Sequence, residues 1–361
     1  MRTKSFFLFL TAVFFILAAV RVNAQPVVNQ NDIKFESSSV ATLVGQDGLI
    51  MRTEDGGLNW NVLNSGITNV LNSNDMYKYT DKLGIEHTVL YAAGENGIIL
   101  SSIDNGLTWN MAVSGTIEHL NKIMIRSANE MYVCGNSGTV LISLDNGLTW
   151  QPAVTNVTAD LNSIALAGLD GSLIDVKAVA VGDNGTVIIS RDYGFTWETI
   201  VSGVITDLNA VIYTGGTSFV AVGNDGTIIK SIDAGITWSI VTSPSSYSLY
   251  DVKYIYDESK AILLASGENG TILSSSDMGE GWKTMSTPTE SDLFAINFGN
   301  VNYGISTGSS GTEIYTTDGG ETWVASLTTD RAGDRKSDLI KLSQNYPNPF
   351  NPATIINYSI S

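Results

Sequence analysis

The chain has 361 residues, of which 43% are hydrophobic and 15% are charged, and its formal net charge is −17. This length and apolar content suffice for a large packed core, and the low proline content excludes a proline-rich disordered tract. The acidic balance disfavours nucleic-acid phosphates and anionic membrane surfaces, so we expect no nucleic-acid partner.

The first element in the chain has the features of an export signal. Arg2 and Lys4 provide a charged start, residues 6–20 form an apolar run, and Ala24 ends a small-residue cleavage site before Gln25. The apolar run is short for a membrane span. We therefore expect residues 1–24 to be a signal peptide whose removal leaves no stable membrane span.

A sequence pattern then recurs seven times. Each unit opens with Gly-x-x-Gly, and a tryptophan follows fifteen residues after the first glycine. Successive tryptophans are 41 to 49 residues apart, and a period in the forties with several short strands per unit is typical of β-propellers. The seven tryptophans are Trp60, Trp109, Trp150, Trp197, Trp238, Trp282 and Trp323.

Each unit is expected to hold four strands, which we name A to D in chain order. Strand A begins at a leucine in six units, as at Leu71. Pairs such as Asn96-Gly97 suit a type I′ turn between strands B and C, because both central residues of that turn need positive φ. Strand D starts at the tryptophan.

An Asp-box, Ser-x-Asp-x-Gly-x-Thr-Trp, links strands C and D. Its aspartate can accept hydrogen bonds from N–H groups of its own turn, and its tryptophan can pack against the neighbouring blade. A catalytic group need occur only once, so seven equivalent aspartates indicate architecture rather than catalysis or calcium binding. These structural aspartates are Asp55, Asp104, Asp145, Asp192, Asp233, Asp277 and Asp318.

The pattern therefore predicts an all-β fold, a seven-bladed β-propeller of four-stranded antiparallel blades over residues 33–326. Both ends of this range fall at whole blades, so we expect the ring to close without an exchanged strand, although residues 25–32 could supply one. We expect no catalytic, cofactor-binding or metal-binding residues. Cys134 lies in an apolar run, and His87 and His119 have no neighbours at metal-ligand spacing.

Residues 33–326 resemble the seven-bladed propellers of the photosystem II assembly and stability factor family in their Leu, Gly-x-x-Gly and Asp-box pattern. The resemblance implies a non-enzymatic protein that binds other proteins. Photosynthetic members use a basic patch, whereas the only arginines between residues 33 and 326 are Arg52, Arg126 and Arg191. This difference disfavours a photosynthetic role.

Two enzyme families with Asp-boxes provide the alternatives. Sialidases have an early Arg-[Ile/Leu]-Pro motif, which is absent here because Thr53 follows Arg52. Xyloglucanase-type glycosidases pair two propellers around a cleft, and inverting hydrolysis needs carboxyl groups roughly 6.5–9.5 Å apart. We expect no enzyme, with a polysaccharide-binding or glycoside-hydrolase-like propeller as the alternative.

The blades differ in the length between strands A and B. The distance from the strand-A leucine to the tryptophan is 30 residues in blades 3, 5 and 7, but 38 in blade 2, 36 in blade 4 and 33 in blade 6. The extra residues fall near 77–87, 167–175 and 255–259, and irregular loops on a rigid scaffold commonly carry recognition. We predict that Tyr77, Tyr79 and Lys82 contact an unidentified protein or glycan partner.

The last element follows a polar linker over residues 327–341. Residues 342–361 contain Tyr-Pro-Asn-Pro-Phe-Asn-Pro, which resembles the opening of the type A C-terminal sorting domain of the type IX secretion system. In that family the domain is a small β-sandwich, so we expect this segment to be the start of a truncated one. The resemblance implies the type IX machinery as a partner. Together with the signal peptide, it implies transport across the inner and then the outer membrane, to the cell surface or the medium.

Overall fold

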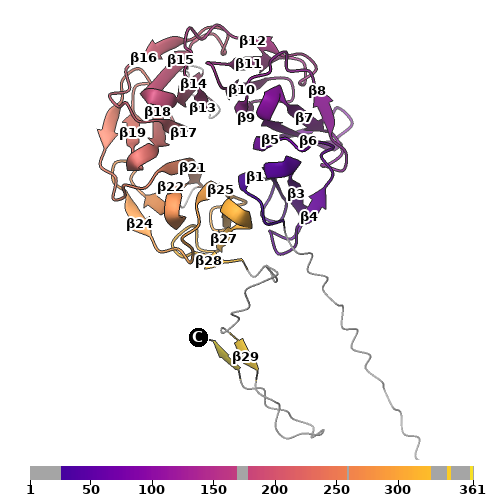
Figure 1. Ribbon diagram of the computed structural model, residues 1–361, viewed down its shortest axis with the longest axis vertical. Helices are drawn as coiled ribbons and strands as arrows, with labels where there is room; N and C mark the ends of the chain where they lie inside the picture. The colour runs from indigo at the N-terminus through magenta and orange to yellow at the C-terminus, as the bar shows by residue number, and fades with distance from the viewer. Residues whose placement is uncertain (1–25, 169–177, 258–259, 327–339, 343–357, 361) are drawn as a thin grey trace, which may run out of the picture.

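The computed structural model describes residues 26–168, 178–257, 260–326, 340–342 and 358–360. Seven four-stranded antiparallel sheets are arranged as blades around a central axis (Figure 1). The predicted all-β, seven-bladed propeller is therefore confirmed. Each blade consists of four consecutive strands, with strand A innermost and strand D at the rim.

The first four blades comprise sixteen strands. They are β1 (Gln30–Phe35), β2 (Ala41–Gly45), β3 (Ile50–Thr53) and β4 (Asn61–Leu63); β5 (Leu71–Thr80), β6 (Glu86–Gly94), β7 (Ile99–Ser102) and β8 (Asn110–Ala112); β9 (Leu120–Ile125), β10 (Met131–Gly135), β11 (Val140–Ser143) and β12 (Gln151–Pro152); and β13 (Leu161–Leu166), β14 (Ala178–Gly182), β15 (Thr186–Ser190) and β16 (Glu198–Ile200).

The last three blades comprise twelve strands. They are β17 (Leu208–Gly215), β18 (Ser218–Gly223), β19 (Ile228–Ser231) and β20 (Ser239–Val241); β21 (Leu249–Tyr256), β22 (Ala261–Gly267), β23 (Ile272–Ser275) and β24 (Lys283–Met285); and β25 (Leu293–Phe298), β26 (Gly304–Gly308), β27 (Glu313–Thr316) and β28 (Val324–Ala325).

The turns between strands B and C have the predicted geometry. In blade 2, Asn96 and Gly97 have φ of 57° and 70°, and the N–H of Ile98 donates to the carbonyl of Glu95. This agrees with a type I′ turn. Six of these turns are η1 (Gln46–Gly48), η2 (Glu95–Gly97), η3 (Asp183–Gly185), η4 (Asn224–Gly226), η5 (Glu268–Gly270) and η6 (Ser309–Gly311).

The first glycine of each unit has a different role from the second. Its backbone is extended, with φ of −166° at Gly94, so it does not need left-handed freedom. A Cβ atom on Gly94 would lie 2.0 Å from the carbonyl oxygen of Val70, just before strand A. The glycine is therefore required by the close approach of the chain that enters the blade.

The Asp-box aspartates accept hydrogen bonds from their own turns. Asp145 accepts hydrogen bonds from the N–H and hydroxyl of Thr149 at 2.9 and 2.6 Å, and from the Ser143 hydroxyl at 2.9 Å. The tryptophans pack between blades. Trp197, for example, is buried in a cluster that includes Ile142 of blade 3 and Ile188 of blade 4. Cys134 is buried in the same cluster.

The ring closes through a segment that precedes the first strand. At the blade 1 to 2 junction, a Cβ atom on Gly48 would lie 2.2 Å from the carbonyl of Ile67, in the link that leads to strand A. At the blade 7 to 1 junction, Pro26 takes the equivalent place, 2.8 Å from such an atom on Gly311. Residues 26–29 thus replace the missing link rather than adding a strand to blade 7, and the first strand starts at Gln30, before the predicted boundary at residue 33.

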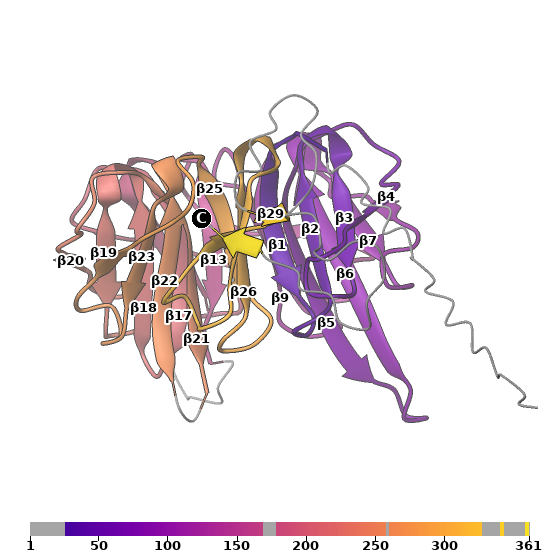
Figure 2. The same cartoon turned by 90° about the horizontal axis from the view of Figure 1, so that it is seen from below.

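The blade 2 insertion differs from the predicted loop. Its residues extend strands A and B, so that β5 and β6 have ten and nine residues and form a hairpin projecting from the ring (Figure 2). Blade 6 has a shorter extension in β21 and β22. Most of the blade 4 insertion lies outside the described residues. We call the side that carries these hairpins the A–B face.

The predicted signal peptide and most of the predicted linker and sorting segment lie outside the described residues. Near the end of the chain, β29 (Ile340–Leu342) pairs with β30 (Tyr358–Ile360) in an antiparallel ladder. None of the helices in the described part of the chain is long and apolar enough to cross a membrane.

Candidate binding site at the centre of the ring

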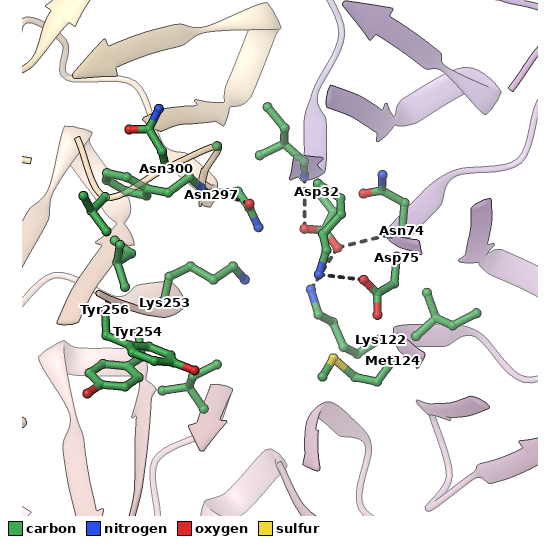
Figure 3. A pocket seen from close by; sticks show the side chains of 18 residues that line it. Asp32, Asn74, Asp75, Lys122, Met124, Lys253, Tyr254, Tyr256, Asn297 and Asn300 are labelled. Carbon is green, nitrogen blue, oxygen red and sulfur yellow. Dashed lines mark hydrogen bonds and ion pairs between the residues drawn. The ribbon is translucent and has the colours of Figure 1, made fainter. Parts of the chain in front are cut away.

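The innermost strands line a pocket of about 400 Å³ on the axis of the ring. Among the described residues, blades 1, 2, 3, 5, 6 and 7 contribute to its wall. Figure 3 shows side chains that enter it from several strands, including Asp32 of β1, Lys122 of β9 and Lys253 of β21. Several of these residues occupy the second and fourth positions after the first residue of strand A, so successive blades present equivalent sites.

Side chains two residues after the first residue of strand A hold neighbouring blades together. Strand A has a free inner edge, and its N–H groups need partners. The hydroxyl of Ser73 accepts a hydrogen bond from the N–H of Ile123 in the next blade, at 3.3 Å. Asp32 accepts one from the N–H of Asn74 at 3.1 Å in the same way. The polar residues of the wall are therefore partly architectural.

Three lysines of the wall form ion pairs with aspartates. Lys122 lies 2.8 Å from Asp32, Lys34 lies 2.7 Å from Asp75, and Lys253 lies 2.9 Å from Asp251. The six groups have no net formal charge.

The Asp32–Lys122 pair remains ionised inside the ring. Burial acts to raise the pKa of Asp32, but Lys122 and Lys253 outweigh it and the pKa lies below its ordinary value. Burial likewise acts to lower the pKa of Lys122, but Asp32, Asp251 and Asp75 raise it overall.

The remaining wall of the pocket is less polar. Tyr254 and Tyr256 stack with ring centroids 5.2 Å apart and an angle of 18° between their planes. Met124 of β9 and Ile212 of β17 also line the pocket. Asn297 accepts a hydrogen bond from the N–H of Phe298 at 2.9 Å, which leaves its amide N–H groups as further donors.

Comparison with protein families agrees with the repeat and the fold. Residues 17–116 match the family described as photosynthesis system II assembly factor YCF48, and residues 314–325 match the BNR/Asp-box repeat. The chain is a seven-bladed propeller of the BNR type. A comparison with curated proteins gave no match.

Several solved structures share the propeller fold. "YCF48 bound to D1 peptide" is 19% identical, with a TM-score of 0.65, and the match covers 81% of this chain and 93% of that one. "YCF48 from Cyanidioschyzon merolae" is 16% identical, with a TM-score of 0.63 and coverage of 82% and 97%. The WD40 β-propeller domain of Doa1 is 13% identical, with a TM-score of 0.58 and coverage of 82% and 97%.

The residues predicted to contact a partner lie together on the blade 2 hairpin, away from this pocket. Tyr77 is half-buried and packs against the core cluster between blades 2 and 3. Tyr79 stacks on His87 with ring centroids 5.1 Å apart, and Lys82 is exposed at the tip. Among the described residues of the three predicted insertions, Ile255 and Tyr256 of blade 6 reach the pocket.

Sequence reasoning missed the lysines of the pocket. Alignment of the seven units at the glycines and tryptophans separates Lys34 from Lys253, because the length between strand A and the first glycine differs between blades. Alignment at the start of strand A would have placed Lys34 and Lys253 in equivalent positions. It would also have placed Asp32, Lys122 and Asp251 together.

The geometry of a sialidase or metal site is not formed by the described residues. Arg52 pairs with Glu36, Arg126 with Glu130, and Arg191 with Glu198, so the three arginines do not converge. The described residues contain no group of three or more histidine, cysteine or acidic side chains placed to hold a metal ion.

Proposed function

We propose that this propeller is a non-enzymatic scaffold that binds a protein partner through its A–B face. The observation that carries this proposal is the blade 2 hairpin, which holds apolar side chains well away from the ring. Leu83 is 83% exposed and Ile85 is 53% exposed at its tip. Isolated exposed apolar residues are common, but these two lie close together on an ordered projection.

The tip is held in one conformation by Asp81. Its Oδ1 accepts hydrogen bonds from the N–H groups of Leu83 and Ile85 at 2.8 and 2.9 Å, and its Oδ2 lies 3.0 Å from Nε2 of His87. These contacts lower the pKa of Asp81, with the His87 hydrogen bond as the largest cause. A preordered tip loses little conformational entropy on binding, which favours its insertion into an apolar pocket of a partner.

The similar structures support a binding role without identifying the partner. One of them is described as YCF48 bound to D1 peptide, and another is a WD40 propeller domain. At 19% and 13% identity these likenesses concern the fold alone. The A–B hairpins differ in length between the blades of this chain, so they are the surface on which we expect partner specificity.

The proposal is tested with a pair of serine substitutions in the full chain. Leu83→Ser with Ile85→Ser leaves the hydrogen bonds of Asp81 in place, because they involve backbone N–H groups. We expect capture of the partner to fall at least about tenfold, as is typical when apolar anchor residues are truncated. Unchanged capture would refute the role of the hairpin.

A matched control lies on the opposite face. Val113 and Ile117 are 83% and 84% exposed in the link between β8 and β9. Val113→Ser with Ile117→Ser removes a comparable exposed apolar surface and should leave capture unchanged.

Export to the cell surface is the second part of the proposal. Its support is the signal-like sequence of residues 1–24 and the sorting-domain pattern of residues 342–361, which would engage the type IX secretion machinery. Cell fractionation tests it. Deletion of residues 1–24 should retain the protein in the cytoplasm, and equal surface exposure of the deleted and full-length chains would count against export.

A glycan ligand is the alternative, favoured by the stacked Tyr254 and Tyr256 beside the central pocket. Hydrolysis is less well supported, because a general acid needs a raised pKa whereas that of Asp32 is lowered. A glycan array separates the two readings, since binding to a defined polysaccharide would favour the alternative and a blank array the protein partner.

A further inference from the structure

The central pocket exposes ammonium groups and covers their carboxylate partners. The side chains of Lys34, Lys122 and Lys253 are 34%, 20% and 20% exposed. Their aspartate partners, Asp75, Asp32 and Asp251, are only 5%, 5% and 10% exposed. A ligand on the axis would therefore meet N–H donors first, although the six charges balance.

The carboxylates are engaged by the strand edges, although Asp32 and Asp75 also line the pocket. Asp32 accepts hydrogen bonds from the Ser73 hydroxyl at 2.7 Å and the N–H of Ile33 at 3.0 Å, besides those from Asn74 and Lys122. Both carboxylate oxygens of Asp32 therefore accept hydrogen bonds. The other two carboxylates are engaged in the same manner: Asp75 accepts from the N–H of Ile125, and Asp251 from those of Val252 and Ile296.

The lysines have donors to spare. Each ammonium carries three N–H groups, and each of these lysines pairs with one carboxylate in the structure. Figure 3 shows Lys253 reaching into the middle of the pocket, which Asn297 also lines. Several convergent donors in a recessed site favour an oxygen anion, which forms charge-assisted hydrogen bonds with them.

The apolar part of the wall indicates the chemistry of the rest of the ligand. Met124, Ile212 and Tyr254 line the pocket together with the lysines. An inorganic anion would leave these apolar surfaces unused, whereas an organic acid with an apolar or aromatic body would cover them. A volume of about 400 Å³ is in the range of small-molecule sites.

We propose that the central pocket binds the carboxylate of a ligand with an apolar or aromatic body, held by Lys34, Lys122 and Lys253. The carboxylate could belong to a free organic acid or to the C-terminus of a polypeptide, since both offer the same chemistry. The inference rests on the proposed function in treating the propeller as a binding scaffold, but the pocket is separate from the blade 2 hairpin.

The test uses calorimetric titration of the full chain with three probes. They are N-acetylphenylalanine, a hexapeptide that ends in phenylalanine with a free carboxylate, and the same peptide with an amidated C-terminus. We expect the amidated peptide to bind at least about tenfold more weakly than the free one, because a charged acceptor is lost. Binding of the small acid as tight as that of the free peptide would indicate a free acid as the ligand, and binding of the peptide alone would indicate a chain terminus.

Two variants connect the binding to this pocket. Lys253→Gln should weaken carboxylate binding at least about tenfold. Lys283→Gln, a matched change of an exposed lysine on β24, should not alter it. If Lys253→Gln does not fold, Lys34→Gln replaces it, since that side chain is the most exposed of the three.

Equal binding of the free and amidated peptides, no binding of either acid, or unchanged binding in the folded lysine variant would each overturn the inference. None of these experiments alters Leu83 or Ile85, which form the proposed partner surface. Failure of the carboxylate site is therefore distinguishable from failure of the proposed partner surface.

Discussion

At the scale of single residues, the clearest departure from the repeat is Gln30. It begins strand A of blade 1, where the other six blades have leucine. Its side chain is fully buried, and neither amide atom has a hydrogen-bond partner among the described residues. A buried amide without partners costs about 1–3 kcal/mol of stability.

Gln30→Leu should therefore stabilise the ring. We expect the free energy of unfolding to rise by about 1–3 kcal/mol, because leucine fills this position in the other blades without an unpaired polar group. Urea unfolding followed by tryptophan fluorescence measures the change. The reverse substitution in blade 2, Leu71→Gln, should lower the midpoint, and a lower midpoint for Gln30→Leu would contradict the account.

The Asp-box aspartates make stability depend on pH. The pKa of all seven carboxyls is lowered, to about 2 for Asp104 and Asp318. For Asp104 the largest cause is the hydrogen bond from the Thr108 hydroxyl. An unfolded aspartate has a pKa of about 3.9. The stabilisation is therefore complete above that value and is lost as the pH falls through the folded-state pKa.

We expect constant stability from about pH 7 to pH 5 and a steep loss between about pH 4 and pH 2. Thermal unfolding at a series of pH values measures it. Thr108→Val removes one hydroxyl donor to Asp104 and should make the acid loss slightly smaller. A melting temperature that does not change between pH 5 and pH 2 would show that these carboxylates do not stabilise the turns.

At the scale of the elements, asparagines connect successive strands A. Five blades have an asparagine directly after the first residue of strand A, and its Nδ2 donates to the carbonyl of the first residue of the next strand A at 2.9–3.1 Å. Blades 6 and 7 have Tyr250 and Phe294 instead, whose ring centroids are 5.6 Å apart. The asparagines are Asn31, Asn72, Asn121, Asn162 and Asn209.

Removal of one such connection should be measurable. Asn121 donates to the carbonyl of Leu161 at 3.0 Å and to Oδ1 of Asn136 at 2.9 Å. We expect Asn121→Ala to lower the free energy of unfolding by about 1–2 kcal/mol. Asn110→Ala, at an exposed position of β8, should stay within about 0.5 kcal/mol of the parent chain and provides the control. Equal effects of the two substitutions would argue against the connection.

The elements were largely predictable from the sequence, with one instructive exception. Glycine pairs, Asp-boxes and tryptophans each impose local geometry, so the strands and turns followed from short-range chemistry. The extra length of blade 2 was visible, but a count of residues does not distinguish a loop from longer strands. The outcome depends on pairing such as that of Tyr79 with His87, which forms only when β5 and β6 continue together.

At the scale of the whole molecule, closure of the ring depends on residues 26–29. The carbonyl of Asn29 accepts a hydrogen bond from the N–H of Gln46 at 3.0 Å, and its Oδ1 accepts one from the N–H of Ser310 at 3.1 Å. The segment therefore contacts the B–C turns of both blades 1 and 7. Blades 7 and 1 lie at opposite ends of the propeller sequence, so no continuous link along the chain joins them, unlike the other successive blades.

A chain that begins at Gln30 should be less stable than one that begins at Pro26. Loss of these hydrogen bonds should lower the free energy of unfolding by about 2–3 kcal/mol. Calorimetric melting of the two chains, with Asn29→Ala as an intermediate case, measures the effect. Identical melting temperatures would mean that contacts between β1 and β25 close the ring without this segment.

The central pocket is a property of the whole ring, and this explains why it was not predicted. Lys122 and its partner Asp32 are 90 residues apart and meet only because the seven blades close. The residues next to each lysine in the sequence do not distinguish it from any other lysine in a strand. The extra length that forms the hairpin is visible in the sequence of blade 2 alone. The pocket is formed by residues of six blades, so its lining depends on how those blades are arranged in space.

The central claim is that a protein partner binds the A–B face, and site-specific photo-crosslinking tests it most directly. A photoreactive amino acid replaces Leu83 on the blade 2 hairpin or Ile117 on the opposite face, which are 83% and 84% exposed. Irradiation in cells that make the full chain should give a discrete crosslinked product from position 83 and none from position 117. A product from position 117 alone, or equal products from both, would contradict the claim.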